Sequence, residues 1–413
     1  MSVVKRASRA TTKTLPKPRM WTGTRAIAEA VKLADVDVIA AYPIRPYTGV
    51  MNSLAKMLAD GEFVAEIIVA DSEHSQFEIA KHASAVGART FVGSSGVGLA
   101  YAAEPITVTS LGQVPVVAIA GCRALDDPGN FGMEWNDVLM FRDQGWLMAW
   151  AKDPQEALDM TLVAYRVSED SRVLLPHFVA VDGAAITHIS APVDPPSRDE
   201  VARFLPSYKP MYPLDPAYGP VTKAQHIAPS LIGPELRKVI DNAMTGAAEV
   251  IREAWQDYSK LVARDYPPLV ETKYMEDAEI ALVTMGAYSK DAMHVAGKLR
   301  AQGVKVGVLR LRYFRPFPTR EIAKALGQLK AVGVIDFSYS FGSADSSSVL
   351  FNEVRSAFFA NRSAPLFMDF MFVGGREPSV KHFERAVRTL QQSADQGVVE
   401  ERVQWPTLRS GSS

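Results

Sequence analysis

Short apolar segments, each followed by an amphipathic one, constrain the fold of this chain more than any other feature. Between residues 24 and 190 the apolar segments have the length of strands and the segments between them have a helical pattern. Strands are expected at 36–42, 66–70, 89–92, 114–120 and 172–181, and helices at 47–59, at 73–86, after Gly98 and from Asp153. Buried strands that alternate with helices are typical of a parallel sheet covered on both faces. The sequence therefore predicts an α/β domain over 24–190.

The same alternation returns over 277–396, which predicts a second α/β domain. Its strands are expected at 280–284, 304–311, 331–336 and 366–372, with helices near 288–302, 319–329, 346–358 and 379–392. Between the two domains, residues 191–234 hold ten of the 26 prolines, and proline cannot donate a hydrogen bond to a sheet. A proline-rich extended connector followed by one helix over 235–263 is expected within 191–276. Residues 397–413 are expected to form a tail.

The first 23 residues are expected to form a basic N-terminal arm. Six basic groups and no acidic one lie among the first twenty residues. An apolar core of the kind that secretory signals need is missing. A disordered arm or one that wraps a partner is expected, with a transit peptide as the alternative, and a cytoplasmic location is favoured.

Composition excludes several classes of protein. A formal net charge of -1 over 413 residues does not fit a nucleic-acid-binding protein. No apolar run approaches the ~20 residues that cross a bilayer. The single cysteine, Cys122, forms no disulfide within the chain, and an iron–sulfur cluster needs several thiolates. The seven histidines lack the spacing of metal ligands, so no metal site is expected.

Two loops with charged side chains follow the first two predicted strands. The loop 42–47 carries Arg45 between two prolines, and an arginine at a strand tip can hold a carboxylate with paired hydrogen bonds. It can equally be a surface arginine in a turn. Ser72 and Glu73 open a helix, where they could be an N-cap and an acid favoured by the helix dipole. The alternative is that the Glu73 carboxylate faces the same crevice as Arg45.

Two further loops follow the next two strands. The glycine-rich turn 93–98 could approach a phosphate closely, but it lacks the lysine of a P-loop and the full dinucleotide pattern. Close packing against a cofactor or a subunit is equally compatible with it. The loop 122–132 combines Arg123 with two acids, a proline and two glycines. It could be a mobile loop that presents either charge, or a solvated turn.

Taken together these loops resemble the pyrimidine-binding domain of the 2-oxoacid:ferredoxin oxidoreductases. The residues that carry the resemblance are Tyr42-Pro43-Ile44-x-Pro46, Ser72-Glu73, the Ser95-Gly96 turn and Arg123. The second unit resembles the transketolase C-terminal-like domain of that family, through the segment 307–317 and, later, Gly374-Gly375-Arg376. The similarity covers residues 24–395 and rests on the combination of motifs.

The resemblance implies a role for several residues. Glu73 would pair with the aminopyrimidine of thiamine pyrophosphate and so help to form its carbon nucleophile. Pro43 and Ile44 would line the cofactor, and Arg123 would hold the carboxylate of the substrate. The Gly-Asp-Gly…Asn signature that holds the diphosphate through magnesium is missing, so a beta-type subunit would have to supply it. A further gamma/delta-type subunit would carry the iron–sulfur clusters, in an assembly expected to be a dimer of heterotrimers.

Arg45 departs from the family pattern, because members that use pyruvate have threonine at this place. A second arginine in the pocket implies a dianionic substrate, and the pattern then resembles oxalate oxidoreductase. Oxalate would be oxidised to two molecules of carbon dioxide without coenzyme A, and two electrons would pass to ferredoxin. Asp126 or Asp127 would swing toward the site as Arg123 swings out, with Phe131 packing the loop.

Three alternatives remain open at the level of sequence. The substrate could be pyruvate, 2-oxoglutarate or another 2-oxoacid, with Arg45 binding a distal carboxylate. A transketolase-like enzyme would need a diphosphate motif and phosphate-binding residues, and neither is seen. A non-catalytic scaffold subunit would fit if Glu73 faced solvent.

Overall fold

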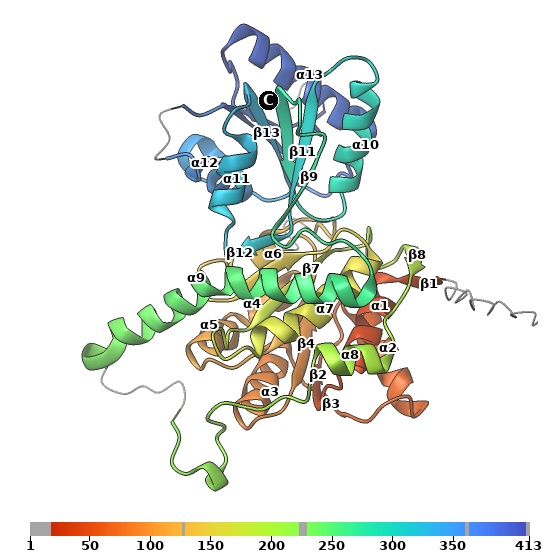
Figure 1. Cartoon of the computed structure of the whole chain (residues 1–413), viewed down its shortest axis with the longest axis vertical. Coiled ribbons are helices and arrows are strands. Elements are labelled where there is room, and N and C mark those ends of the chain that lie inside the picture. The colour runs from red at the N-terminus through yellow and green to blue at the C-terminus, as the bar shows by residue number, and fades with distance from the viewer. Residues whose placement is uncertain (1–17, 126–128, 223–228, 360–362, 410–413) are drawn as a thin grey trace, which may run out of the picture.

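The first domain is built on a seven-stranded sheet with the strand order β12-β6-β7-β5-β4-β2-β3. Every neighbouring pair in it is parallel except β12 with β6. The computed structural model, which describes residues 18–125, 129–222, 229–359 and 363–409, shows this sheet below a second one (Figure 1). The strands of the first sheet are β2 (Val38–Ala41), β3 (Glu66–Val69), β4 (Thr90–Ser94), β5 (Val117–Cys122), β6 (Leu147–Trp150), β7 (His177–Asp182) and β12 (Tyr313–Arg315).

Strand β5 shows why both faces of this sheet are covered. Successive side chains of a strand point to opposite faces. Val117 and Ile119 belong to one buried cluster, with residues of the helices on that face, while Ala118 and Ala120 belong to the other. The helices of the first face are α1 (Gly23–Leu33), α2 (Thr48–Ala59) and α7 (Pro154–Ser168), and those of the second are α3 (Glu73–Ala85), α4 (Val97–Tyr101), α5 (Ala103–Leu111) and α6 (Asn136–Leu139). The predicted parallel α/β domain is confirmed.

The second domain has a six-stranded sheet in the order β15-β14-β13-β10-β11-β9, in which only β9 is antiparallel. Its strands are β9 (Val270–Lys273), β10 (Ile280–Thr284), β11 (Val306–Leu311), β13 (Ala331–Asp336), β14 (Leu366–Met371) and β15 (Val403–Gln404). Its helices are α10 (Ser289–Arg300), α11 (Thr319–Leu326), α12 (Val349–Ser356) and α13 (Val380–Gln396). The four predicted strands correspond to β10, β11, β13 and β14, and the four predicted helices to α10–α13, to within a few residues. Strand β9 was not predicted and lies in the expected connector, and β15 adds part of the expected tail to the sheet.

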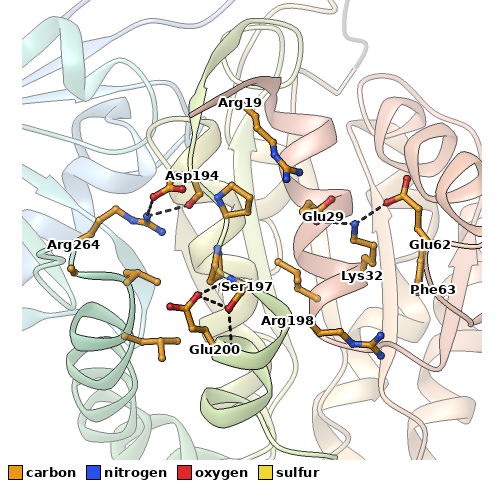
Figure 2. A pocket seen from close by; sticks show the side chains of 16 residues that line it. Arg19, Glu29, Lys32, Glu62, Phe63, Asp194, Ser197, Arg198, Glu200 and Arg264 are labelled. Atoms are coloured by element: carbon orange, nitrogen blue, oxygen red, sulfur yellow. Dashed lines mark hydrogen bonds and ion pairs between the residues drawn. The ribbon is translucent and has the colours of Figure 1, made fainter. Parts of the chain in front are cut away.

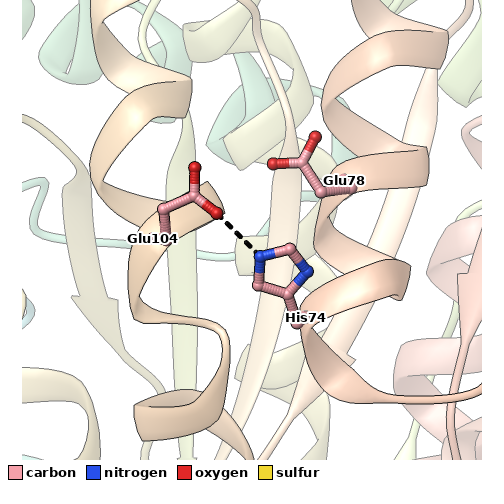
Figure 3. Close-up of side chains that lie close together, drawn as sticks. All are labelled: His74, Glu78 and Glu104. Atoms are coloured by element: carbon pink, nitrogen blue, oxygen red, sulfur yellow. Dashed lines mark hydrogen bonds and ion pairs between the residues drawn. The ribbon is translucent and has the colours of Figure 1, made fainter.

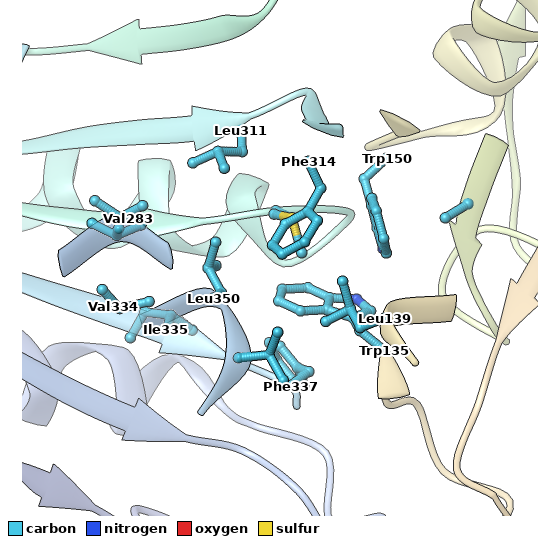
Figure 4. Close-up of a cluster of buried hydrophobic side chains, with 14 of the residues drawn as sticks. Trp135, Leu139, Trp150, Val283, Leu311, Phe314, Val334, Ile335, Phe337 and Leu350 are labelled. Atoms are coloured by element: carbon cyan, nitrogen blue, oxygen red, sulfur yellow. The ribbon is translucent and has the colours of Figure 1, made fainter. Parts of the chain in front are cut away.

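The two domains are joined by a shared strand and a shared core. Strand β12 follows β11 directly, leaves the second sheet and pairs with β6 at the edge of the first. In the core between the domains, Trp135 and Trp150 of the first domain contact Phe337 and Phe314, of which Phe314 belongs to β12 (Figure 4). The rings of Trp135 and Phe337 lie 5.1 Å apart.

A buried ion network crosses the same boundary. Glu156, in the first turn of α7, accepts two hydrogen bonds of 2.8 Å from the terminal nitrogens of Arg310 and one of 2.8 Å from Arg312. All three side chains are at most 1% exposed. Although burial opposes ionisation, the two guanidinium groups hold the pKa of Glu156 well below its usual range. The boundary expected at residue 276 is thus crossed by a strand, a core and a charge network.

Residues 190–222 contain more regular structure than the expected extended connector. Strand β8 (Ser190–Val193) pairs antiparallel with β1 (Arg19–Thr22), so part of the expected N-terminal arm is a strand, while residues 1–17 lie outside the described residues. Helix α8 (Arg198–Phe204) begins with a capping box in which Ser197 and Glu200 satisfy each other's backbone N–H groups. After the short 3-10 helix η1 (Pro216–Tyr218), helix α9 (Pro229–Val262) begins six residues before the predicted start at 235.

One predicted strand was too long. Residues 172–176 lie in the turn and loop after α7, where Val173 donates its N–H to the carbonyl of Asp170 and Leu174 has a φ of 46°. The strand β7 therefore begins only at His177. In the described part of the chain, no helix is long and apolar enough to cross a membrane.

Candidate active site

The four loops singled out in the sequence lie along one edge of the first sheet. They follow β2, β3, β4 and β5, which are parallel and stand next to one another in the order β5-β4-β2-β3. The carboxyl ends of parallel strands meet at one edge of a sheet, which is where ligands of open α/β folds bind. The loops that the sequence separates by up to 80 residues therefore share one edge.

Glu73 is the first residue of α3 and is 7% exposed. Ser72 caps this helix by accepting a hydrogen bond of 3.2 Å from the N–H of Ser75, as the capping interpretation predicted. A Cβ at Gly98 would lie 2.6 Å from Oε1 of Glu73 and 2.6 Å from the hydroxyl of Ser94. Within the described residues, no side chain or backbone N–H binds the Glu73 carboxylate. Burying a carboxylate costs free energy unless a partner satisfies it, so this position suits a ligand that donates hydrogen bonds.

Arg123 follows β5 and is 7% exposed. A Cβ at Gly96 would lie 2.7 Å from Nε of Arg123, so the guanidinium group packs against the glycine-rich turn. Its carbon Cζ lies 5.0 Å from the ring centre of Phe131, which is 70% exposed. Asp126 and Asp127 lie outside the described residues.

Arg45 lies on the same edge, but its side chain is exposed, and within the described residues no ion pair holds it. Pro43 is also exposed and Ile44 is half-buried. The loop is anchored further on, where buried Tyr47 packs its ring against Gly93 of β4. The structure thus places Glu73 and Arg123 against one turn, through Gly98 and Gly96, while Arg45 reaches solvent beside it.

Three buried polar residues in or near this turn were assigned no individual role from the sequence. The hydroxyl groups of Ser94 and Ser95 find no hydrogen-bond partner within the described residues. The Asp137 carboxylate, on α6, accepts from the backbone N–H groups of Gly96 and Arg123 at 2.9 and 3.1 Å. Burial raises the pKa of Asp137 to about 7, although these hydrogen bonds oppose the change. The serines lay within a motif that the sequence had marked, but Asp137 carried no signal of its own.

A histidine and two glutamates gather on the outer side of α3 and α5 (Figure 3). Nε2 of His74 lies 2.7 Å from a carboxylate oxygen of Glu104, and Glu78 stands one turn further along α3. The potential ligand atoms of the three residues lie within 4.8 Å of one another. Glu78 already pairs with Lys81 on α3 at 2.7 Å, while the His74–Glu104 hydrogen bond joins α3 to α5. The expectation of no metal site stays a prediction.

A cavity of about 880 Å³ opens elsewhere on the first domain, between α1, α8 and the end of α9 (Figure 2). Lys32 at the end of α1 binds Glu29 and Glu62 at 2.8 Å each along one wall. Arg264 pairs with Asp194 on the other. Because α1 ends just before β2 begins, this cavity lies at the amino-end edge of the sheet, and none of the candidate residues lines it.

Known families match both domains. The family described as "Pyruvate flavodoxin/ferredoxin oxidoreductase, thiamine diP-bdg" matches residues 29–257. The family described as "Pyruvate:ferredoxin oxidoreductase core domain II" matches residues 278–383. The two matches together cover the pyrimidine-binding-type domain and the transketolase C-terminal-like domain that the motifs indicated.

Full-length relatives agree with these matches. The chain is 35% identical over 397 residues to pyruvate synthase subunit PorA of Pyrococcus abyssi, which covers 96% of this chain and 99% of that protein. It is 30% identical over 395 residues to ketoisovalerate oxidoreductase subunit VorA of Pyrococcus horikoshii, covering 95% and 99%.

A solved structure has the same fold. It is 2-oxoglutarate:ferredoxin oxidoreductase from Magnetococcus marinus with 2-oxoglutarate, coenzyme A and succinyl-CoA bound, at a TM-score of 0.68 and 16% identity. The match covers 90% of this chain and 65% of that longer chain. From the family matches and the full-length relatives, the chain belongs to the 2-oxoacid:ferredoxin oxidoreductase family and is an alpha-type subunit of such an enzyme.

Proposed function

We propose that this subunit provides the pyrimidine side of a thiamine pyrophosphate site and part of the substrate pocket, in an enzyme that oxidises a 2-oxoacid. The names of the full-length relatives, pyruvate synthase and ketoisovalerate oxidoreductase, favour a monocarboxylic 2-oxoacid such as pyruvate. The substrate carboxyl group would leave as carbon dioxide and the acyl group would pass to the thiol of coenzyme A. The two electrons released would pass to ferredoxin.

One observation carries this proposal: the buried Glu73 carboxylate lies beside Gly98 with no hydrogen-bond donor among the described residues. Thiamine pyrophosphate fits this place, because its aminopyrimidine offers the donors that Glu73 lacks. The lack of a side chain at Gly98 keeps the carboxylate accessible, and the Ser94 and Ser95 hydroxyl groups add unsatisfied polar atoms close by. When bound, the cofactor supplies a carbon nucleophile. Glu73 holds and moves the proton at the pyrimidine nitrogen.

Arg123 is the proposed partner of the substrate carboxylate. Its guanidinium group is buried against the turn at Gly96, and a buried arginine can bind a carboxylate with two parallel hydrogen bonds. The exposed ring of Phe131 lies within cation–π distance of the group. The proposed movement of Asp126 and Asp127 rests on sequence alone.

Other subunits would complete the enzyme. The chain lacks the signature that holds the cofactor diphosphate through magnesium, so a beta-type subunit would provide it. Cys122 is fully buried in β5, so this chain offers no accessible thiolate for an iron–sulfur cluster. A gamma/delta-type subunit would hold the clusters that reduce ferredoxin, in a cytoplasmic dimer of heterotrimers.

Oxalate is the second candidate substrate, and Arg45 is the observation that favours it. The residue stands at the carboxyl end of β2, where a second cation would bind a second carboxylate. Its exposed side chain would have to turn inward to do so. The scaffold alternative required a solvent-facing Glu73, and the observed burial of this residue speaks against it.

The test is reduction of ferredoxin or a viologen by the purified complex with pyruvate, 2-oxoisovalerate, 2-oxoglutarate or oxalate, each with and without coenzyme A. Reduction by a monocarboxylic 2-oxoacid that depends on coenzyme A supports the main proposal. Reduction by oxalate without coenzyme A supports the second candidate instead. No reduction with any of the four acids, by a complex that retains its clusters and cofactor, would refute both.

A further inference from the structure

We propose that Asp137 is a positioning residue for the candidate active site and that the second domain holds Asp137 in place. The inference rests on the proposed function for the role of Arg123, but its structural part can be tested without any substrate. The proposal rests on four consecutive residues, 134–137. The first three bind the second domain, and the fourth, Asp137, binds the loops of the candidate active site.

One carboxylate oxygen of Asp137 joins two of the candidate loops. Its Oδ2 accepts a hydrogen bond of 2.9 Å from the backbone N–H of Gly96 and one of 3.1 Å from that of Arg123. Gly96 and Arg123 follow neighbouring strands, β4 and β5, and both hydrogen bonds are buried; the Asp137 side chain belongs to a residue that is 0% exposed. Asp137 therefore fixes the backbone of Arg123. It also fixes the turn at Gly96, against which the Arg123 side chain packs.

The three preceding residues are bound to the second domain. Glu134 accepts a hydrogen bond of 2.8 Å from the N–H of Gly374. The N–H of Trp135 donates to the carbonyl of Phe337 at 2.9 Å. These contacts tie the segment to the loops after β14 and β13, and Figure 4 shows the Trp135 ring beside Phe337 in the core between the domains.

Asn136 completes this attachment and stands next to Asp137 in the chain. Its side-chain amide donates to the carbonyl of Tyr339 and its amide oxygen accepts from the N–H of the same residue, both at 2.9 Å. A pair of hydrogen bonds to one backbone unit fixes both position and orientation. Because α6 begins at Asn136, the second domain sets where the first turn of this short helix, and hence Asp137, lies.

The same domain contacts the loop after Arg123. Gly375 packs on the side chain of Asn130 and on Gly132, so closely that a side chain there would overlap with them. Asn130 in turn donates to Glu134 at 3.2 Å. The loop that begins at Arg123 is thus held at its far end by the second domain and at its start by Asp137. The second domain would act on substrate binding through these contacts, beyond packing subunits together.

The experiment compares D137A, D137N and N136A in the complete complex. Asparagine keeps an oxygen acceptor for both N–H groups, whereas alanine leaves two buried donors unsatisfied. We expect D137A to raise KM for the 2-oxoacid about tenfold, with a smaller change in kcat, because a misplaced group costs binding and orientation. D137N should restore most of the loss, and N136A should raise KM about threefold. D143A, at an exposed aspartate shortly after α6, is the control and should behave as wild type.

Hydrogen exchange gives a readout that is independent of activity. The amides of Gly96 and Arg123 should exchange faster in D137A and N136A than in wild type, and as in wild type in D137N and D143A. Faster exchange with no activity on any 2-oxoacid in wild type would support the structural inference while refuting the proposed function. Unchanged exchange and KM in D137A would overturn the inference. If D137A does not fold, the inference is tested with N136A alone. Amide exchange and KM equal to those of wild type in N136A would overturn the coupling to the second domain.

Discussion

Oε1 of Glu73 lies 2.6 Å from the point where Gly98 would carry a Cβ. Alanine at Gly98 would therefore push the carboxylate away from its position, although the helical backbone of α4 tolerates alanine well. We expect G98A to lower kcat by at least tenfold while thermal unfolding changes little. G246A, on α9 where a Cβ meets nothing within 4 Å, is the matched control and should keep full activity.

Replacing Glu73 by glutamine tests the proposed proton transfer directly. The amide has the same shape but cannot hold the proton, so turnover should fall by roughly 10²–10⁴-fold, the usual contribution of a general acid–base group. The measurement is viologen reduction at saturating thiamine pyrophosphate, alongside thermal unfolding. E78Q, on the same helix, should retain activity. Wild-type turnover in E73Q would remove Glu73 from the mechanism.

Arg45 decides between the two candidate substrates. If a monocarboxylic 2-oxoacid is the substrate, R45T should leave kcat/KM for pyruvate within a few-fold of wild type, because the exposed arginine contributes little. If oxalate is the substrate, losing one of two cations that bind a dianion should raise KM for oxalate about a hundredfold. Steady-state rates of wild type and R45T with each acid distinguish these outcomes.

The buried network at the domain boundary should dominate stability. Removing the charge of Glu156 leaves Arg312 buried without its anion and leaves Arg310 with Glu271 alone, so E156Q should lower the free energy of unfolding by about 3–5 kcal/mol. E253Q, which breaks an exposed pair with Arg172, should unfold as wild type does. Because the folded pKa of Glu156 is depressed, its contribution is present above its ordinary pKa of 4.5 and is lost as pH falls further. A Tm of E156Q equal to that of wild type at pH 7 would contradict this.

Two buried aspartates on neighbouring strands should make stability fall at high pH. Burial, and then the charge of Asp336, raise the pKa of Asp369 to about 7. A raised folded pKa favours the protonated protein, so this contribution is full below the ordinary value of 3.8 and is lost as pH rises through about 7. The Ser348 N–H and hydroxyl groups donate to the Asp369 side chain. In D369N the side-chain amide can still form hydrogen bonds with both groups. D369N should melt above wild type at pH 8, and the difference should shrink as the pH falls toward 4. The exposed control D395N should follow wild type throughout.

Local sequence signals predicted most of the fold because they report on neighbouring residues. Asp153 and Pro154 start α7 as expected, with the Asp153 side chain accepting from the N–H of Glu156. The continuous apolar segment before Gly121 predicted β5, because a short apolar run is itself a local signal of a buried strand. The change of sheet between β11 and β12 was missed, because Leu311 and Tyr313 are both suited to a strand and only packing decides which sheet each one joins.

The candidate site could be proposed from the sequence where residues lie just beyond a strand, as Arg123 does after β5, or open the next helix, as Glu73 does. Asp137 was not, because its partners are 41 and 14 residues away and a single aspartate in a short helix has no distinguishing pattern. In the sequence, Glu156 is indistinguishable from any acidic residue in the first turn of a helix. Its buried partners could not be predicted, because they are 154 and 156 residues away. The sequence left open whether Arg45 enters the pocket or lies on the surface, because exposure depends on packing; in the structure its side chain is exposed.

Strand β12 has a consequence for how the protein is made. The edge of the first sheet at β6 stays open until residue 315 has been synthesised and has left the ribosome, although the other strands of that sheet are complete at residue 182. An unpaired strand edge can pair with another chain. A nascent first domain would therefore depend on rapid synthesis of more than a hundred further residues, or on a chaperone, to avoid association. The chain could not be divided between its domains without exposing that edge again.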